Sequence, residues 1–486
     1  MNNKRRLGIE TAVLSFVRIV TILVNLIQTM ILSRTLTKIQ YGTYSQTLLV
    51  VQFCVVFFSL GLENTINYFY NSTYNEIKRK NYINTIFSIS LISGFVAAVF
   101  LVLFSRRISI GFGNSDITIL IIIISLRPLL QNVIALYQPL FISCGNAGLI
   151  AFVNLAISVL QVALISFLSI KFKDLRLIFG LTLCLDILQL LCFSGIFKKL
   201  HTKIRIVNIR NNYSIKILKY SIPLIIASSV SILFTNMDKL VISGNMSIED
   251  YALYSNMARE LPLTFITNAM TTVFTPLVIR YINDNEIDKF KDLWSKYLEI
   301  GYLLLWPFCV SVITLAPEFI SFLYSEQYLC KEGVQVFAIY NILLMFRFTY
   351  FGLIPTAKGR TDVIMKYSII MCLLNAVLNY PLFKIMGMSG PAVASVLSMA
   401  ISVYLYFRIS IKLVNLRIVE IFSIKKVLFT LFELIIIASV IRIIVNMMGI
   451  FLKKNIVVLI IGEIMFCVCF YGLNFNRIKK IIKSMN

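Results

Sequence analysis

The sequence predicts an all-α, polytopic membrane protein with about fourteen transmembrane helices. Of the 486 residues, 58% are hydrophobic and only 14% are charged, whereas a soluble domain is about 45–50% apolar and about a quarter charged. The apolar residues recur along the whole chain in runs of about 20, the length that crosses the hydrocarbon core. This composition excludes an ordinary soluble enzyme, a disordered chain and a secreted disulfide-bonded scaffold.

The apolar runs define the expected spans. They lie near 10–33, 44–68, 83–104, 117–141, 149–170, 177–197, 217–243, 251–279, 294–323, 332–356, 361–383, 388–411, 426–448 and 455–474. Five prolines are expected to interrupt spans, as membrane helices tolerate: Pro128, Pro223, Pro262, Pro307 and Pro381. The connections between spans are short, which leaves no room for a soluble domain.

The basic residues predict the orientation. The net charge is +24, but the basic residues lie in the short connections, so we reject a nucleic-acid partner. With a cytoplasmic N-terminus, the inside segments carry 25 Lys and Arg and the outside segments carry 11, which places both termini inside. One His and nine scattered Cys form no metal or redox pattern, so we expect neither a metal nor a cofactor.

An internal repeat relates two parts of the chain at an offset of 210 residues. Residues 31–46 read ILSRTLTKIQYGTYSQ, and residues 241–256 read VISGNMSIEDYALYSN. The matched pairs are Ser33 with Ser243, Thr37 with Ser247, Tyr41 with Tyr251, Tyr44 with Tyr254 and Ser45 with Ser255. We expect the tyrosine rings to lie at the outer interface, with their hydroxyl groups in water.

Both blocks join one span to the next on the outer face, six spans apart. The two halves therefore share one orientation, as in a parallel repeat whose substrate site lies at the interface of the halves. The expected domains are a six-helix lobe at 1–210, a second six-helix lobe at 211–412, and an additional helix pair with a basic tail at 413–486.

Three stretches resemble a known transporter family. They are SRTLTKIQYGTYS with the following LGLENTINYF, then MDKLVISGNMSIEDYALYSNMAREL, then AKGRTDVIMKYSIIMCLLNAVLNYPLFKIMGMSGPAVAS. They resemble the polysaccharide-export branch of the multidrug/oligosaccharidyl-lipid/polysaccharide exporter superfamily, the flippases for lipid-linked O-antigen and capsule repeat units. The resemblance spans nearly the whole chain and implies two six-helix lobes that form a V around a central cavity. Its motifs are diffuse and identify the fold better than the substrate.

The resemblance implies a flippase for an undecaprenyl-pyrophosphate-linked oligosaccharide in the cytoplasmic membrane. The oligosaccharide would be a repeat unit of O-antigen, capsule or exopolysaccharide. The partners would be this lipid-linked substrate, membrane lipid, a polysaccharide polymerase and a chain-length regulator. Such a protein is not an enzyme. Because the sequence has no Gly-rich Lys-Ser/Thr phosphate loop, energy would come from the membrane potential or from ion exchange.

Charged residues at membrane depth are the candidate substrate-binding residues, because each must be paired, hydrated or extended to the interface. The candidates are Arg18, Arg127, Arg259, Arg347, Asp238 and Glu260. Arginine binds phosphate oxygens bidentately, which suits a pyrophosphate headgroup. Related flippases for lipid-linked precursors carry basic residues on the first, second, seventh and eighth helices. Arg18 and Arg259 match this placement, whereas the second span has no Arg or Lys.

Two acid–base pairs lie at matching depths in neighbouring spans. Arg442 and Glu463 are expected to form an ion pair within the additional helix pair. Arg127 and Asp186 either pair inside the first lobe or face the cavity, and the sequence leaves both alternatives open.

Three alternative functions differ from the flippase in the residues that they require. A cation-coupled multidrug exporter would require acidic and aromatic residues in its cavity, whereas the charge at depth is mainly basic. A membrane glycan polymerase or ligase would require a large outer loop with catalytic residues, and the outer connections are short. A lipid II flippase is a close relative that the sequence does not exclude.

Overall fold

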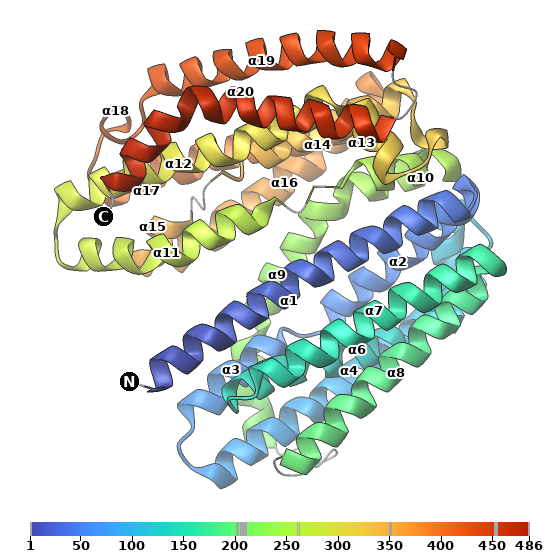
Figure 1. Ribbon diagram of the computed structural model, residues 1–486. Helices are drawn as coiled ribbons and strands as arrows, with labels where there is room; N and C mark the ends of the chain where they lie inside the picture. The colour runs from blue at the N-terminus through green and yellow to red at the C-terminus, as the bar shows by residue number, and fades with distance from the viewer. Residues whose placement is uncertain are drawn as a thin grey trace. The chain divides into compact units, whose positions relative to one another are not determined.

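The computed structural model describes residues 2–200, 204, 211–259, 261, 263–348, 352–451 and 455–484. These residues form twenty α-helices and one 3-10 helix, and they contain no strand (Figure 1). The chain divides into two compact units. Unit 1 comprises Met1–Thr235 and Ser243–Ala252, and unit 2 comprises Asn236–Ile242 and Leu253–Asn486. The division falls in α9 and α10, downstream of the boundary at residue 210 that the repeat predicts.

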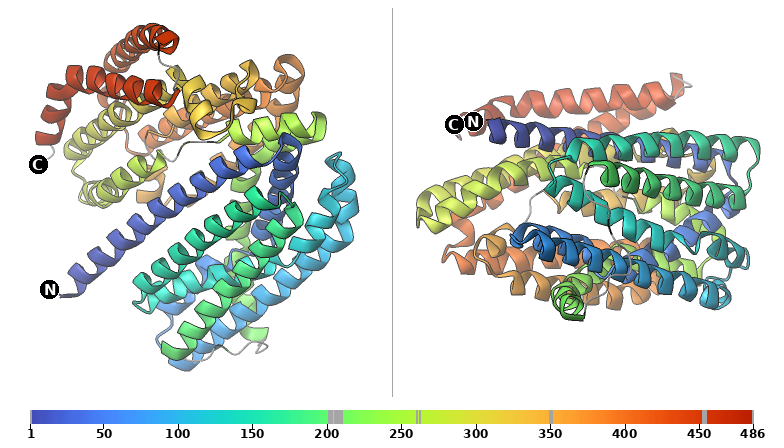
Figure 2. Two further views of the ribbon diagram at one scale, coloured as in Figure 1. Left: turned by 45° about the vertical axis from the view of Figure 1, so that its right-hand side comes forward. Right: turned by 90° about the horizontal axis from the view of Figure 1, so that it is seen from below.

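Unit 1 is a helical bundle that contains the first eight helices and most of the ninth. The bounds are α1 (Asn2–Thr35), α2 (Lys38–Phe58), α3 (Leu62–Ser72), α4 (Glu76–Gly111), α5 (Ile117–Ile124), α6 (Arg127–Ser143), α7 (Ala147–Lys171), α8 (Leu175–Leu200) and α9 (Asn211–Asn245). Helix α1 packs along α7, and α7 packs against α8. In both views of Figure 2, α7 and α8 run side by side.

Unit 2 contains the second half of α10 and all the helices after it. The bounds are α10 (Ile248–Met257), α11 (Thr264–Asn283), α12 (Ile287–Thr314), α13 (Ala316–Leu323), η1 (Glu326–Tyr328), α14 (Lys331–Met345), α15 (Leu353–Ala357), α16 (Thr361–Met386), α17 (Ser389–Leu413), α18 (Ile418–Ile421), α19 (Ile424–Phe451) and α20 (Asn455–Lys483). Helix α12 is the centre of this unit, because α11, α14, α19 and α20 all pack against it.

Ten helices among the described residues are long and apolar enough to cross a membrane, or eleven when α5 and α6, which bend by 41° at their junction, form one span. The expected multi-pass helical membrane fold is therefore confirmed. The three other expected spans fall on α1, on α10 with α11 and on α14 with α15. Their apolar stretches are shorter or interrupted, so the count of fourteen stays a prediction.

The prolines interrupt fewer helices than expected. Pro223, Pro307 and Pro381 lie inside the continuous helices α9, α12 and α16, so the expected interruption is wrong at these three positions. Neighbouring helices and local adjustments satisfy the freed carbonyl groups in such cases. Pro128 lies in the first turn of α6, where a missing N–H removes no helical hydrogen bond. Pro262 lies outside the described residues.

The core of unit 1 is aromatic and closely packed. Phe87, Tyr137, Phe141 and Phe193 lie in one buried cluster from α4, α6 and α8. Two of these helices, α4 and α6, approach each other closely at Gly94, where an added Cβ atom would lie 2.5 Å from the Cα atom of Leu129. Small residues at such crossings allow membrane helices to reach backbone contact.

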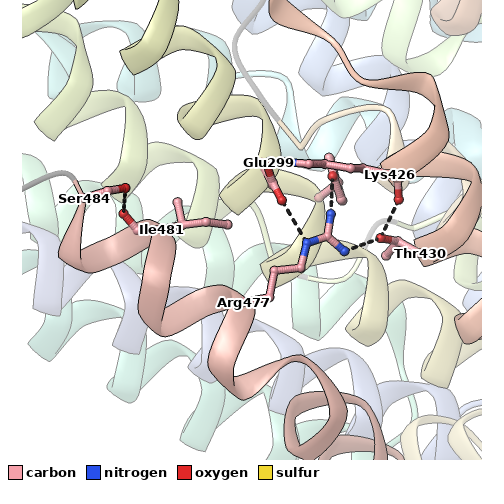
Figure 3. Close-up of polar contacts among 7 residues, drawn as sticks. Glu299, Lys426, Thr430, Arg477, Ile481 and Ser484 are labelled. Carbon is pink, nitrogen blue, oxygen red and sulfur yellow. Dashed lines mark hydrogen bonds and ion pairs between the residues drawn. The ribbon is translucent and has the colours of Figure 1, made fainter.

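A buried carboxylate joins α19 and α20 to α12 (Figure 3). Glu299, which is 8% exposed, accepts hydrogen bonds from Arg477 Nε on one oxygen and from Lys426 Nζ on the other, each at 2.8 Å. Arg477 also donates to Tyr302 Oη at 2.9 Å and to Thr430 Oγ1 at 3.0 Å. Every nitrogen of the guanidinium group therefore bonds within the junction of these three helices.

A second ion pair corrects an expectation from the sequence. Arg442 of α19 pairs with Glu318 of α13, with 3.0 Å between Nη1 and Oε2, and not with Glu463 as expected. Glu463 of α20 instead accepts a hydrogen bond from Ser311 Oγ of α12 at 3.0 Å. The similar depths of Arg442 and Glu463 do not bring them together, because depth does not specify the face of a helix on which a side chain lies.

Replacing Gly94 with alanine tests the close approach of α4 to α6. We expect Gly94→Ala to destabilise the protein by about 1–3 kcal/mol, the usual cost of overpacking, because the added methyl group meets backbone atoms. Gly180→Ala in α8 is the matched control, since nothing lies within 4 Å of its Cβ position. Thermal unfolding of both variants in the same detergent measures the difference, and equal melting temperatures would contradict the close approach.

Candidate functional site

The two repeat blocks begin helices in the same way. Thr37 Oγ1 accepts a hydrogen bond from Gln40 N at 3.2 Å at the start of α2. Ser247 Oγ accepts one from Asp250 N at 3.1 Å at the start of α10. The acceptors Thr37 and Ser247 are 210 residues apart, and so are the donors Gln40 and Asp250. The two halves of the repeat therefore share this capping hydrogen bond as well as similar residues.

A contact between tyrosine and the preceding helix also recurs at the same offset. Gln28 Nε2 donates to Tyr44 Oη at 3.5 Å, and Tyr254 Oη donates to Asp238 Oδ2 at 2.8 Å. Asp238 also accepts hydrogen bonds from Tyr340 Oη of α14 and from the backbone N–H of Lys239. The site candidate Asp238 is 1% exposed and lies in a hydrogen-bonded network inside unit 2.

The repeated tyrosines lie in the protein interior. Tyr41 is 4% exposed, and Tyr251 and Tyr254 are fully buried. The expectation that their hydroxyl groups lie in water is therefore wrong for these three residues. A buried tyrosine requires a hydrogen-bond partner for its hydroxyl group, and Asp238 is that partner for Tyr254.

Each half of the repeat interrupts the same two spans. In the first half, the interruptions separate α2 from α3 and α5 from α6. In the second half, they separate α10 from α11 and α14 from α15. At the α2–α3 interruption, Leu60 and Gly61 have positive φ angles of 52° and 62°. Interrupted spans at corresponding positions of two repeats are the pattern that points to the binding site of a transporter.

Three of the candidate arginines lie at these interruptions. Arg127 is the first residue of α6, Arg259 follows the last residue of α10 by two positions, and Arg347 follows the last residue of α14 by two positions. Arg259 is exposed and Arg347 is half-buried. The sequence indicates two of these interruptions, because Pro128 stands at the start of α6 and Pro262 stands between the bounds of α10 and α11. The segment between α14 and α15 contains no proline.

Arg127 forms an ion pair inside unit 1. Its Nε lies 3.1 Å from Asp186 Oδ2, and Gln131 Nε2 donates to the other oxygen of Asp186 at 2.6 Å. Asp186 is 4% exposed, so its charge is buried and matched by Arg127. The contact joins the start of α6 to the middle of α8.

The remaining candidates are only partly described. Arg18 belongs to α1, and its side chain lies outside the described residues, as does the whole of Glu260. The structure thus brings Arg127 to Asp186 and brings Asp238 to two tyrosines. Among the described side chains, no group of three or more His, Cys, Asp and Glu residues is placed to hold a metal ion.

Sequence reasoning missed the partners Gln28 and Tyr340. Gln28 had a detectable signal, because it lies 210 residues before Asp238, outside the block of matching residues. Tyr340 had none, since its contact with Asp238 depends on how α14 packs against α9.

Paired substitutions distinguish a structural role of Arg127 from a role in binding. Arg127→Met alone leaves the buried carboxylate of Asp186 unmatched, which we expect to cost about 3–5 kcal/mol and to reduce the amount of folded protein. The double variant Arg127→Met/Asp186→Leu removes both charges and should recover the folded protein. Yield and thermal stability measured by size-exclusion chromatography test this expectation. A double variant as unstable as the single variant would contradict it.

Comparisons with known proteins agree with this architecture. The model of a family described as polysaccharide biosynthesis protein matches residues 31–331. The chain is also similar to the capsular polysaccharide biosynthesis protein CapF of Staphylococcus aureus, with 20% identity over 374 residues that cover 75% of this chain and 89% of CapF.

Two solved structures share the fold. The lipid II flippase MurJ in its inward closed conformation has a TM-score of 0.70 and 15% identity, covering 94% of this chain and 98% of MurJ. An inward-facing multidrug resistance MATE family transporter of the MOP superfamily has a TM-score of 0.58 and 11% identity, covering 81% of this chain and 94% of the transporter. The family match covers more than half of the chain and both repeat blocks. The protein therefore belongs to the polysaccharide biosynthesis protein family, which confirms the resemblance carried by its sequence motifs.

Proposed function

We propose that the protein is a flippase that moves an undecaprenyl-pyrophosphate-linked oligosaccharide from the inner to the outer leaflet of the cytoplasmic membrane. The family supplies a role in polysaccharide biosynthesis, and the fold is shared with transporters and with a lipid flippase. The observation that carries the proposal is the placement of Arg259 and Arg347 at two helix interruptions of the second repeat.

Such interruptions suit a large anion that crosses an apolar layer. The N-terminal end of a helix carries a partial positive charge and free N–H groups. Arg259 lies between the end of α10 and the start of α11, so a permanent positive charge stands close to such a helix start. A pyrophosphate group offers several oxygens that arginine binds with two parallel hydrogen bonds.

We assign different roles to the six candidate residues. Arg18, Arg259 and Arg347 bind the pyrophosphate, with Glu260 beside Arg259. Arg127 positions α6 against α8, because Asp186 already matches its charge. Asp238 positions α9 against α10 and α14 through its bonds to Tyr254 and Tyr340.

Translocation makes and breaks no covalent bond, so the protein acts as a transporter and not as an enzyme. The lipid tail stays in the bilayer while the headgroup and its saccharide cross. Energy comes from the membrane potential or from ion exchange. On the outer face, a polymerase and a chain-length regulator would use the translocated repeat unit.

A lipid II flippase is the second candidate function. The observation in its favour is the fold match with MurJ, whose TM-score is 0.70 over 94% of this chain. Expression of this protein in cells depleted of their own lipid II flippase separates the two candidates. Growth of those cells would favour lipid II as substrate, and loss of surface polymer on deletion of the gene would favour the polysaccharide repeat unit.

Replacing the proposed pyrophosphate ligands should block polymer export without loss of protein. Each charged hydrogen-bonding contact contributes about 1.5–3 kcal/mol, so we expect Arg259→Ala or Arg347→Ala to reduce export at least about tenfold. Arg259→Lys should recover part of the activity, because lysine keeps the charge but loses the bidentate geometry. Arg106→Ala, an exposed arginine near the outer end of α4, is the matched control.

Cell-surface polymer is measured together with the protein level in the membrane. Lipid-linked repeat unit should accumulate on the inner leaflet in the inactive variants. Undiminished export by the double variant Arg18→Ala/Arg259→Ala would refute the assignment of these two residues.

The proposed orientation places both termini in the cytoplasm. Single cysteines introduced at residues 216 and 480 should then react with an impermeant maleimide only after the cells are opened. A cysteine at residue 384, in an expected outer connection, should react in intact cells. Opposite labelling of residues 216 and 480 would overturn the proposed topology.

A further inference from the structure

A cavity lies at one end of unit 1, and none of the six candidate residues lines it. Its volume is about 410 Å³, which is within the range of small-molecule sites. It is bounded by the end of α3, the first turns of α4, the turn after α6 and the end of α8. Basic connections gather at this end of the bundle, which the proposed orientation places at the cytoplasmic face.

Two cations from α4 line the cavity. Arg79 and Lys80 lie in its wall, and the Arg79 guanidinium group lies 4.8 Å from the centre of the Tyr70 ring. The carboxylate of Glu76 lies 3.8 Å from Arg79, and its side chain is 88% exposed. Glu76 also lines the cavity, so its wall carries two cations and one carboxylate, and the net positive charge lies beside the ring of Tyr70.

The rest of the cavity wall is mainly apolar. Ile77, Ile83 and Phe197 line the same space. Ile77 is 74% exposed and the neighbouring Tyr74 is 96% exposed. Apolar and aromatic side chains exposed at the end of a membrane helix are typical of the headgroup region. The cavity therefore combines positive charge with hydrocarbon contacts at the level where lipid headgroups lie.

We propose that this cavity binds the phosphate group of a membrane amphiphile, with its oxygens at Arg79 and Lys80 and the first carbons of its chain against Ile77 and Ile83. Basic pockets between membrane helices on the cytoplasmic side hold lipid phosphates in this way. An anionic phospholipid and a polyisoprenyl phosphate share this chemistry. The site does not depend on the proposed flippase activity, because it is built entirely from residues of unit 1.

A natural cysteine reports on occupancy of the cavity. Cys144 lines it, is half-buried, and its Sγ lies 3.2 Å from Tyr70 Oη. Burial raises the pKa of the Cys144 thiol above its ordinary value, so modification by N-ethylmaleimide is measured under alkaline conditions, where more of the thiolate is present. Cys330, also half-buried and in unit 2, is the internal reference.

The experiment uses the purified full-length protein and mass spectrometry of the modified peptides. The probes are undecaprenyl phosphate, dioleoyl phosphatidylglycerol, inorganic phosphate and the uncharged alcohol undecaprenol. We expect at least one phosphate amphiphile to slow the modification of Cys144 about tenfold without an effect on Cys330. Inorganic phosphate and undecaprenol at the same concentration should have no such effect.

Three single variants test the assigned contacts. Arg79→Gln and Lys80→Gln should each raise the amphiphile concentration needed for protection at least about tenfold, the effect of one lost charged contact. Lys78→Gln removes an equal charge from the same helical turn, but Lys78 does not line the cavity, so protection should be unchanged. Ile77→Ser should weaken binding of the amphiphile. Because the side chain of Ile77 is exposed, we expect this variant to fold.

Protection by one amphiphile alone supports the site and identifies the source of the phosphate. Equal protection in the double variant Arg79→Gln/Lys80→Gln, or equal protection by undecaprenol, overturns the proposal, as does the absence of protection by both phosphate amphiphiles. Because the measurement requires no transport, a failure of the proposed flippase function would leave its result unaffected.

Discussion

The cost of leaving a charge unmatched inside an apolar layer is the constraint on which much of this structure depends. A buried ion without a partner costs several kcal/mol, so it must find an opposite charge or strong hydrogen-bond donors. Arg127 meets the buried Asp186 between α6 and α8, and the buried Glu299 of α12 meets Lys426 of α19 and Arg477 of α20. Each buried carboxylate joins helices that are not neighbours in the sequence. The charged residues therefore help to specify which helices pack together and how they are aligned along their axes.

The same constraint explains which parts of the fold are predictable from sequence. Because lipid offers no hydrogen bonds to the backbone, long apolar runs must be helical, and the predicted helical membrane architecture is confirmed. The ion pairs are less predictable. Arg442 and Glu463 have similar depths, yet Glu318 lies on the helix face that Arg442 meets. Sequence position specifies height along a helix, whereas partner choice also depends on rotation about the helix axis.

The candidate site was predictable in residue type and only partly in local structure. Arginines at membrane depth are visible in the sequence. Pro128 and Pro262 stand at the interruptions beside Arg127 and Arg259, whereas Pro223, Pro307 and Pro381 lie inside continuous helices. Proline alone therefore does not separate an interrupted helix from a continuous one. Tertiary packing decides where a membrane helix stops, and a single sequence does not contain that information in a local pattern.

The tyrosine contacts of the repeat make its two halves chemically different at equivalent positions. The offset of 210 residues relates Gln28 to Asp238 and Tyr44 to Tyr254, so the contact has the same place in both halves. Its chemistry differs, because an amide bonds the tyrosine in one half and a carboxyl group bonds it in the other. Unit 2 therefore holds an ionisable group in its interior where unit 1 holds a group that does not ionise.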